Sequence, residues 1–267
     1  MKKSAYSIII ELTKTIFSYG FILCIVITAL LCFTSEIYID STTGQEYSVI
    51  EIMADKSRFS LYDFKSAGIL HSSVSPYLTI FIPVLSSIPF VTVFCAERIG
   101  GNMRFVISRL GKKIYYIAKF ISAIISSGMA VMLGFILYSI IICITFPIGI
   151  LTVSELLKMY AGMGIYGIIS VIPAFFISSF IKNKYMICCF PFIFMHFYYT
   201  SISMIQDIFN SHDRYDIIAK MTSLYPSELK EIFFNFNIWT ITYNLALLVA
   251  AFIGFTIIMN RRLDYGQ

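Results

Sequence analysis

The side chains that could do chemistry are scattered along this chain, with one exception. The three histidines, His71, His196 and His212, lie far apart. Neither a His-Glu-x-x-His nor a Gly-x-Ser-x-Gly sequence places a base beside a metal or a nucleophile. The Gly-Lys-Lys at 111–113 lacks both the upstream glycine loop and the hydroxyl of a phosphate-binding loop. The sequence therefore predicts neither a catalytic centre nor a metal or nucleotide site.

The exception is the segment 97–113, which mixes acidic, basic, glycine and apolar residues. We expect the two glycines at 100–101 to break the chain, a short helix over Asn102–Ser108 to follow, and Gly111 to end it. A plain linker would not need the apolar residues of this helix, which suit a groove in a partner protein. The alternative is a helix that rests on lipid. The candidate partner-binding residues are Glu97, Arg98, Gly100, Gly101, Arg104, Phe105 and Arg109.

Long apolar segments must hold this helix in place. The chain has 267 residues, of which 58% are hydrophobic and 13% charged, about half the charge of a soluble domain. Six runs without Asp, Glu, Lys or Arg exceed 20 residues, enough for a helix to cross about 30 Å of hydrocarbon. We therefore predict an all-α membrane protein that forms one transmembrane domain over 1–267. The six predicted spans are 15–35, 75–96, 114–146, 159–181, 185–206 and 238–260.

Charge is sorted between the two faces that six spans would create. The face with both termini carries 13 Lys and Arg against three acids, a net of +10, and the other face has a net of −5. Positive charge in short loops is retained in the cytoplasm. Both termini are therefore predicted to be cytoplasmic. The basic balance follows from this sorting, and it does not indicate a nucleic-acid partner.

The segments around the spans also show patterns. Residues 4–14 alternate apolar and polar residues at helical spacing, with Glu11 and Lys14 on the polar side. This pattern predicts an amphipathic helix in the cytoplasmic interface, and a simple extension of the first span is an equal alternative. Outside the membrane we expect short helices near 49–53 and 61–64, and two more over 217–224 and 227–236. Glycines at 162, 164 and 167 indicate close packing on a neighbouring helix or a second subunit.

Four residues are candidates for a path or a gate: Pro83, Pro89, His196 and Pro226. We expect the two prolines of the second span to kink it or to break its hydrogen bonds, which would serve either gating or static packing. His196 lies inside a span, where a neutral histidine hydrogen-bonded to a neighbouring span is the simpler interpretation. None of the predicted spans holds a deeply placed carboxylate or lysine, and this argues against an ion-coupled carrier.

The chain resembles the membrane subunits of type-2 ATP-binding-cassette (ABC) exporters. Residues 97–118 carry most of the likeness, through a Glu-Arg-x-Gly-Gly turn after the second span. A basic stretch similar to Ser-Arg-x-x-Lys-Lys then enters the third span at 108–113. The chain departs from the pattern at 100–101, where it has two glycines and one is expected.

The resemblance implies partners and a role. The helix near 102–110 and the N-terminal amphipathic helix would contact a cytosolic ABC ATPase, the former as the coupling helix. The helices over 217–236 would form an outer re-entrant pair, and two permease subunits would enclose a path. ATP and Mg²⁺ would bind the ATPase, so this chain would hold no cofactor and would not be an enzyme. Its place would be the cell membrane of a bacterium, among membrane lipid.

The cargo and two other functions stay open. Family members export lipids, polysaccharides, peptides or drugs, and uncharged walls favour an amphipathic or hydrophobic cargo. One alternative is a membrane-embedded protease or acyltransferase that uses His196 with Tyr198 or Ser201. The other is a structural or immunity protein that transports nothing.

Overall fold

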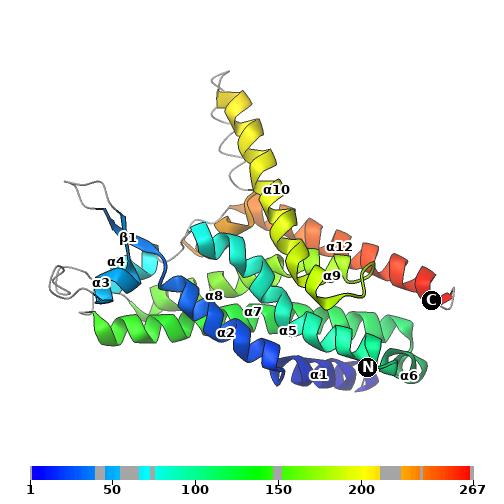
Figure 1. The fold of residues 1–267 in the computed structure, drawn as a ribbon. Coiled ribbons are helices and arrows are strands. Elements are labelled where there is room, and N and C mark those ends of the chain that lie inside the picture. The colour runs from blue at the N-terminus through cyan, green and yellow to red at the C-terminus, as the bar shows by residue number, and fades with distance from the viewer. Residues whose placement is uncertain are drawn as a thin grey trace.

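The computed structural model describes residues 2–39, 46–54, 66–72, 76–146, 152–210, 224–234 and 237–264. In these ranges the chain is a helical bundle with one small β-hairpin (Figure 1). Five of its helices are long and apolar enough to cross a membrane: Leu78–Ile99, Lys112–Thr145, Val153–Ile177, Lys184–Ile208 and Ile238–Arg261. They correspond to the second to sixth predicted spans. The all-α, multi-pass prediction is thus confirmed, whereas the count of six is reached only through the bent pair described next.

The first predicted span, 15–35, is divided between two helices. α1 (Lys2–Ile16) and α2 (Tyr19–Cys32) meet at an angle of 56° and qualify as a span only together. The Ser18 hydroxyl caps α2 by accepting a hydrogen bond from the Phe21 amide at 3.2 Å. With 14 residues, α2 is only about 21 Å long, less than the thickness of the hydrocarbon core.

The long helix α7 (Lys112–Thr145) is the centre of the bundle. It packs against α1, α2, α5 (Pro76–Ile99) and α8 (Val153–Ser170), the last of which is followed by α9 (Ile172–Ile177). Glycines allow these approaches: a Cβ on Gly128 would lie 2.9 Å from the Gly164 carbonyl oxygen, and one on Gly167 would lie 2.9 Å from Val131. The predicted close packing of the glycine-rich segment is therefore with helices of the same chain.

α5 is one continuous helix despite Pro83 and Pro89, and the predicted interruption is of its hydrogen bonds and not of the helix itself. A proline at 83 cannot donate to the carbonyl of residue 79. The hydroxyl of Tyr166 donates to that carbonyl instead, at 3.0 Å. A buried tyrosine on α8 thus replaces the bond that the proline removes, and this explains why the helix persists.

Two helices are much less covered than the others. In the apolar window of α5, 61% of residues are buried inside the chain, against 22% in α10 (Lys184–Asn210) and 17% in α12 (Ile238–Asp264). α10 runs away from the bundle at its far end, as Figure 1 shows. The apolar surface of α10 and α12 therefore faces the surroundings of the chain.

Short elements gather at the end of the bundle away from the termini (Figure 1). Strands β1 (Glu36–Ile39) and β2 (Glu46–Ser48) form an antiparallel hairpin that the sequence reading missed. α3 (Val49–Ala54) confirms the helix predicted near 49–53, and α4 (Ser66–Ser72) follows. The helix predicted over 227–236 is a 3₁₀-helix, η2 (Pro226–Glu231). The helices predicted at 61–64 and 217–224 lie outside the described residues.

Candidate functional site

The basic segment predicted as a partner-binding helix forms α6 (Asn102–Leu110), at the same end of the bundle as both termini (Figure 1). It is bounded by Gly101 with φ 71° and Gly111 with φ 83°. Residues with a Cβ rarely adopt such left-handed angles. The predicted start at 102 and the stop at 111 are therefore confirmed, and the glycine at 101 has a conformational reason.

The two faces of α6 differ in exposure. Met103 is buried, and Val106 and Ile107 pack beside it against a core shared with α5 and α7. On the other side, 70% of the Phe105 side chain is exposed. Arg104 and Arg109 are exposed as well. α6 is thus fixed by one apolar face while it presents an aromatic ring and two guanidinium groups outward.

Arg98 anchors the end of α5 that leads to α6. Its guanidinium donates to the Ser178 carbonyl at 2.7 Å and to the Ile181 carbonyl at 2.9 Å. These carbonyls belong to the turn after α9, where the last carbonyls of a helix lack partners within the helix. Arg98 therefore joins two segments far apart in sequence, and it acts as a structural support for α6 rather than as part of its outward face.

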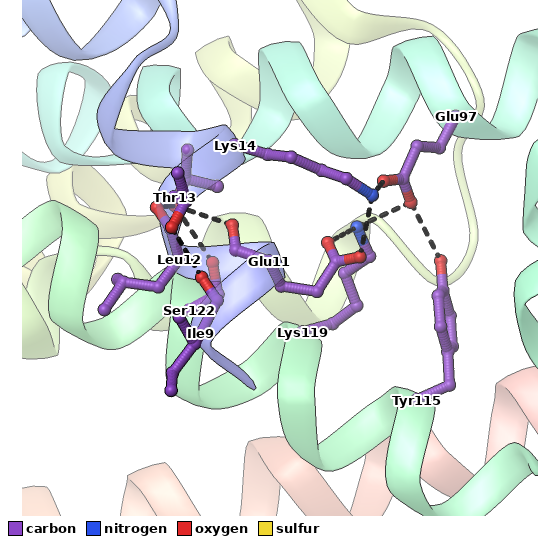
Figure 2. Close-up of polar contacts among 10 residues, drawn as sticks. Ile9, Glu11, Leu12, Thr13, Lys14, Glu97, Tyr115, Lys119 and Ser122 are labelled. Carbon is purple, nitrogen blue, oxygen red and sulfur yellow. Dashed lines mark hydrogen bonds and ion pairs between the residues drawn. The ribbon is translucent and has the colours of Figure 1, made fainter. Parts of the chain in front are cut away.

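A cluster of four charged side chains joins α1, α5 and α7 next to this region (Figure 2). We call Glu11, Lys14, Glu97 and Lys119 the charge cluster. Lys119 forms ion pairs with Glu11 and, at 2.6 Å, with Glu97. Lys14 lies 3.1 Å from both carboxylates. Two positive and two negative groups therefore close a ring of ion pairs across three helices.

The members of the charge cluster differ in burial. The Lys119 and Glu11 side chains are 2% and 3% exposed, Glu97 is 11% exposed, and Lys14 is 43% exposed. The Tyr115 hydroxyl donates to Glu97 at 3.5 Å (Figure 2). Burying a charge is unfavourable unless a partner compensates it. The buried members therefore depend on one another.

The packing of α1 shows which of its sides meets the bundle. A helix in the membrane interface is expected to turn its polar side to water. Here Ser7, Glu11 and Thr15 are buried against the bundle, whereas Tyr6 and Ile9 are exposed. The hydroxyls of Thr15 and of Ser122 on α7 lie 3.0 Å apart. α1 thus binds the bundle through its polar side and leaves its apolar side outward, the arrangement expected where lipid surrounds the chain.

Sequence reasoning placed the charge-cluster residues on the cytoplasmic face without bringing them together. Glu11 and Lys119 are 108 residues apart, so no local spacing signals their contact. One signal was present: Glu11 and Lys14 share the polar side of an amphipathic helix. If the polar side of this helix faces the protein interior, its charged residues need partners of opposite charge. Lys119, near the start of the third predicted span, is a residue that could serve as such a partner.

The structure does not bring the four candidate path residues together. Pro83 and Pro89 are buried within α5, and His196 is exposed on α10. Pro226 lines a cavity between α9, α10 and α12 whose lining includes none of the other three. The hydrogen bond predicted for the His196 ring is absent among the described residues, where its contact is with the adjacent Phe197 ring at 6.3 Å.

The structure also places the residues named for a membrane-embedded enzyme. Ser201 is exposed, and the Tyr198 hydroxyl donates to the Leu224 carbonyl at 2.8 Å. Within the described ranges, no group of three or more His, Cys, Asp or Glu residues is placed to hold a metal ion. His196 thus has neither a nucleophile nor an acid placed against it in this part of the chain.

Two comparisons with known proteins were without a match. No protein-family model and no curated protein matches the chain. The outward face of α6 and the charge cluster that supports it are therefore the features of this chain that bear on its function.

Proposed function

We propose that this chain is the permease subunit of an ATP-driven exporter, with ATP hydrolysed by a separate cytosolic ABC ATPase. The observation that carries the proposal is α6. Its Phe105 ring is exposed between two exposed arginines, on a helix fixed at both ends and along one side. Aromatic and arginine side chains dominate the binding energy of many protein interfaces. A rigid amphipathic helix of this kind suits a groove in a partner.

The surroundings of α6 suit the transmission of a partner's movement. α7 begins at the residue directly after Gly111, and α5 ends just before α6. The charge cluster then connects α5 and α7 to α1. A displacement of α6 would therefore act on three helices together. This is a structural reason to expect that hydrolysis in a bound ATPase would be coupled to the bundle here.

The proposed membrane topology depends on the distribution of charge and on the bent pair of α1 and α2. If α1 and α2 count as one span, the chain crosses the membrane six times and both termini lie on one side. That side carries the excess of Lys and Arg, so we assign it to the cytoplasm of a bacterial cell. The weakly covered α10 and α12 leave surface for lipid and for a second permease subunit. The uncharged spans favour an amphipathic or hydrophobic cargo.

Purification with its ATPase tests the proposal. The chain would be expressed with the ATPase encoded beside it and isolated through a tag on the permease. We expect the ATPase to co-purify and its hydrolysis to be stimulated by the permease. Phe105→Ala should lower both, whereas Phe233→Ala, which truncates an exposed phenylalanine just after η2, should leave both unchanged. A chain that inserts normally but neither binds nor stimulates the ATPase would contradict the proposal.

A further inference from the structure

An apolar cavity of about 400 Å³ lies between α9, α10 and α12. In the described part of the chain α10 packs on α5 and α9, and α12 packs on α9 and η2, while α10 and α12 touch each other little. Two of the lining residues on α12, Ala250 and Ala251, have small side chains. The cavity thus results from two consecutive spans that are held apart by a third segment.

The cavity walls are almost entirely hydrocarbon. α10 contributes Phe190, Phe194 and Met195, and α12 contributes Leu247, Ala250 and Ala251. The polar side-chain atom of the lining is the Tyr198 hydroxyl, which donates to the Leu224 carbonyl at 2.8 Å and lies 3.1 Å from the Tyr243 hydroxyl. Because that hydroxyl already has partners, the cavity requires no hydrogen bond from an occupant.

We propose that this cavity binds one acyl chain of a bilayer phospholipid. The helices α9, α10 and α12 belong to candidate spans, and a helix that crosses a membrane is surrounded by hydrocarbon over about 30 Å. The lining residues Phe194 and Ala250 are exposed, which gives an acyl chain lateral access. An unfilled apolar cavity forfeits van der Waals contacts on its whole surface. The inference uses only the arrangement of the spans, so it is independent of the exporter assignment.

A neighbouring polar hollow fits the other end of such a lipid. It is lined by hydroxyl-bearing side chains on the next face of α10 and on the segment before and in η2, namely Tyr199, Thr200, Ser203, Tyr225 and Ser227. Tyr198 and Pro226 of the apolar cavity adjoin this set in sequence. Hydroxyl groups donate to ester and phosphate oxygens. The acyl chain would therefore enter with its ester end toward these hydroxyls.

The volume of the cavity distinguishes between two possible occupants, an acyl chain and a transmembrane helix of a second copy of this chain. A helix about 10 Å wide that crosses about 30 Å of hydrocarbon occupies about 2,400 Å³. The cavity offers about 400 Å³, a volume at the low end for small-molecule sites. A narrow, flexible chain fits this space, and a spanning helix does not.

Photolabelling with a phosphatidylcholine that carries a diazirine near the end of one acyl chain tests the proposal. The full chain would be reconstituted in vesicles of this lipid and egg phosphatidylcholine, irradiated and mapped by mass spectrometry. We expect labels to concentrate on the cavity-facing residues Phe194, Met195 and Ala251. Ala250→Phe should reduce labelling of Phe194 and Met195 about tenfold, because added bulk excludes the chain. Ala246→Phe adds the same bulk to an exposed position outside the lining and should leave the labelling unchanged.

Controls make each result decisive. Ala251→Phe is a second filling variant, and size-exclusion chromatography verifies that each variant is folded. Equal labelling of the exposed residues Leu245, Val249 and Ile253 would show only the general lipid shell and would overturn the proposal. Labelling could also disappear in a dimeric fraction that shows cross-links between copies at Phe194. That result would assign the cavity to a second subunit and would overturn the proposal.

Discussion

The charge cluster and α6 lie in the same region of the molecule and use the same types of side chain in opposite ways. Lys119 and Glu11 are almost completely buried and paired. Arg104 and Arg109 are exposed, and within the described residues they form no ion pair. Paired, buried charges specify how α1, α5 and α7 fit together. Exposed charges beside an exposed ring are available to another molecule. The comparison therefore distinguishes buried charges that stabilise the packing of this region from exposed charges that can bind a partner.

The largest expected effect comes from Lys119→Met. This change leaves Glu11 and Glu97 buried without their main partner, and removing one member of a buried ion pair destabilises a protein by about 3–5 kcal/mol. We expect a clear loss of thermal stability in detergent, measured by differential scanning fluorimetry, and faster hydrogen exchange in α1.

The double variant Glu11→Gln, Lys119→Met serves as the control for that prediction. Because it removes a charge of each sign, it should recover part of the stability lost in Lys119→Met. If Lys119→Met alone is as stable as the unchanged chain, the charge cluster does not hold these helices together and the comparison fails.

Gly101→Ala has the next largest expected effect. A residue with a Cβ at φ 71° is destabilised by roughly 1–2 kcal/mol. We expect α6 to exchange amide hydrogen faster and the chain to melt at a lower temperature. Gly68→Ala is a matched control, since its added Cβ would meet nothing within 4 Å and its φ is not positive. If both changes lower the melting temperature equally, the positive φ of Gly101 is not the reason that a glycine occupies this position.

Lys14→Met tests the exposed member of the charge cluster. Its side chain is 43% exposed although it lies 3.1 Å from two carboxylates. Ion pairs in contact with solvent contribute about 1 kcal/mol or less. The loss of stability should therefore be several times smaller than for Lys119→Met in the same melting assay. Similar losses would mean that burial does not distinguish the two lysines.

The smallest effect on stability is expected for the double variant Arg104→Ala, Arg109→Ala. Surface substitutions away from paired groups usually change stability by about 0.5 kcal/mol or less. The melting temperature should stay close to that of the unchanged chain, while the yield of co-purified ATPase should fall. A large drop in melting temperature would show that these arginines support the fold.

The sequence predicted the parts of the structure that depend on local composition. Runs without charge predicted the candidate spans, and Gly101 and Gly111 predicted the limits of α6. Contacts between distant segments could not be predicted in this way, as the ion pairs of Lys119 show. The continuity of α5 at Pro83 likewise depends on Tyr166, a residue 87 positions from the carbonyl that it satisfies. The short hairpin of β1 and β2 was missed because its strands have only four and three residues.

Site-specific photo-cross-linking tests the central claim, that the outward face of α6 binds the ATPase. Benzoylphenylalanine would replace Phe105 in one variant and Phe233 in another, each co-expressed with the proposed ABC ATPase partner. We predict a cross-link to the ATPase from position 105 and none from position 233. An ATPase that is stimulated by the chain but cross-links equally from both positions, or from neither, would contradict the claim.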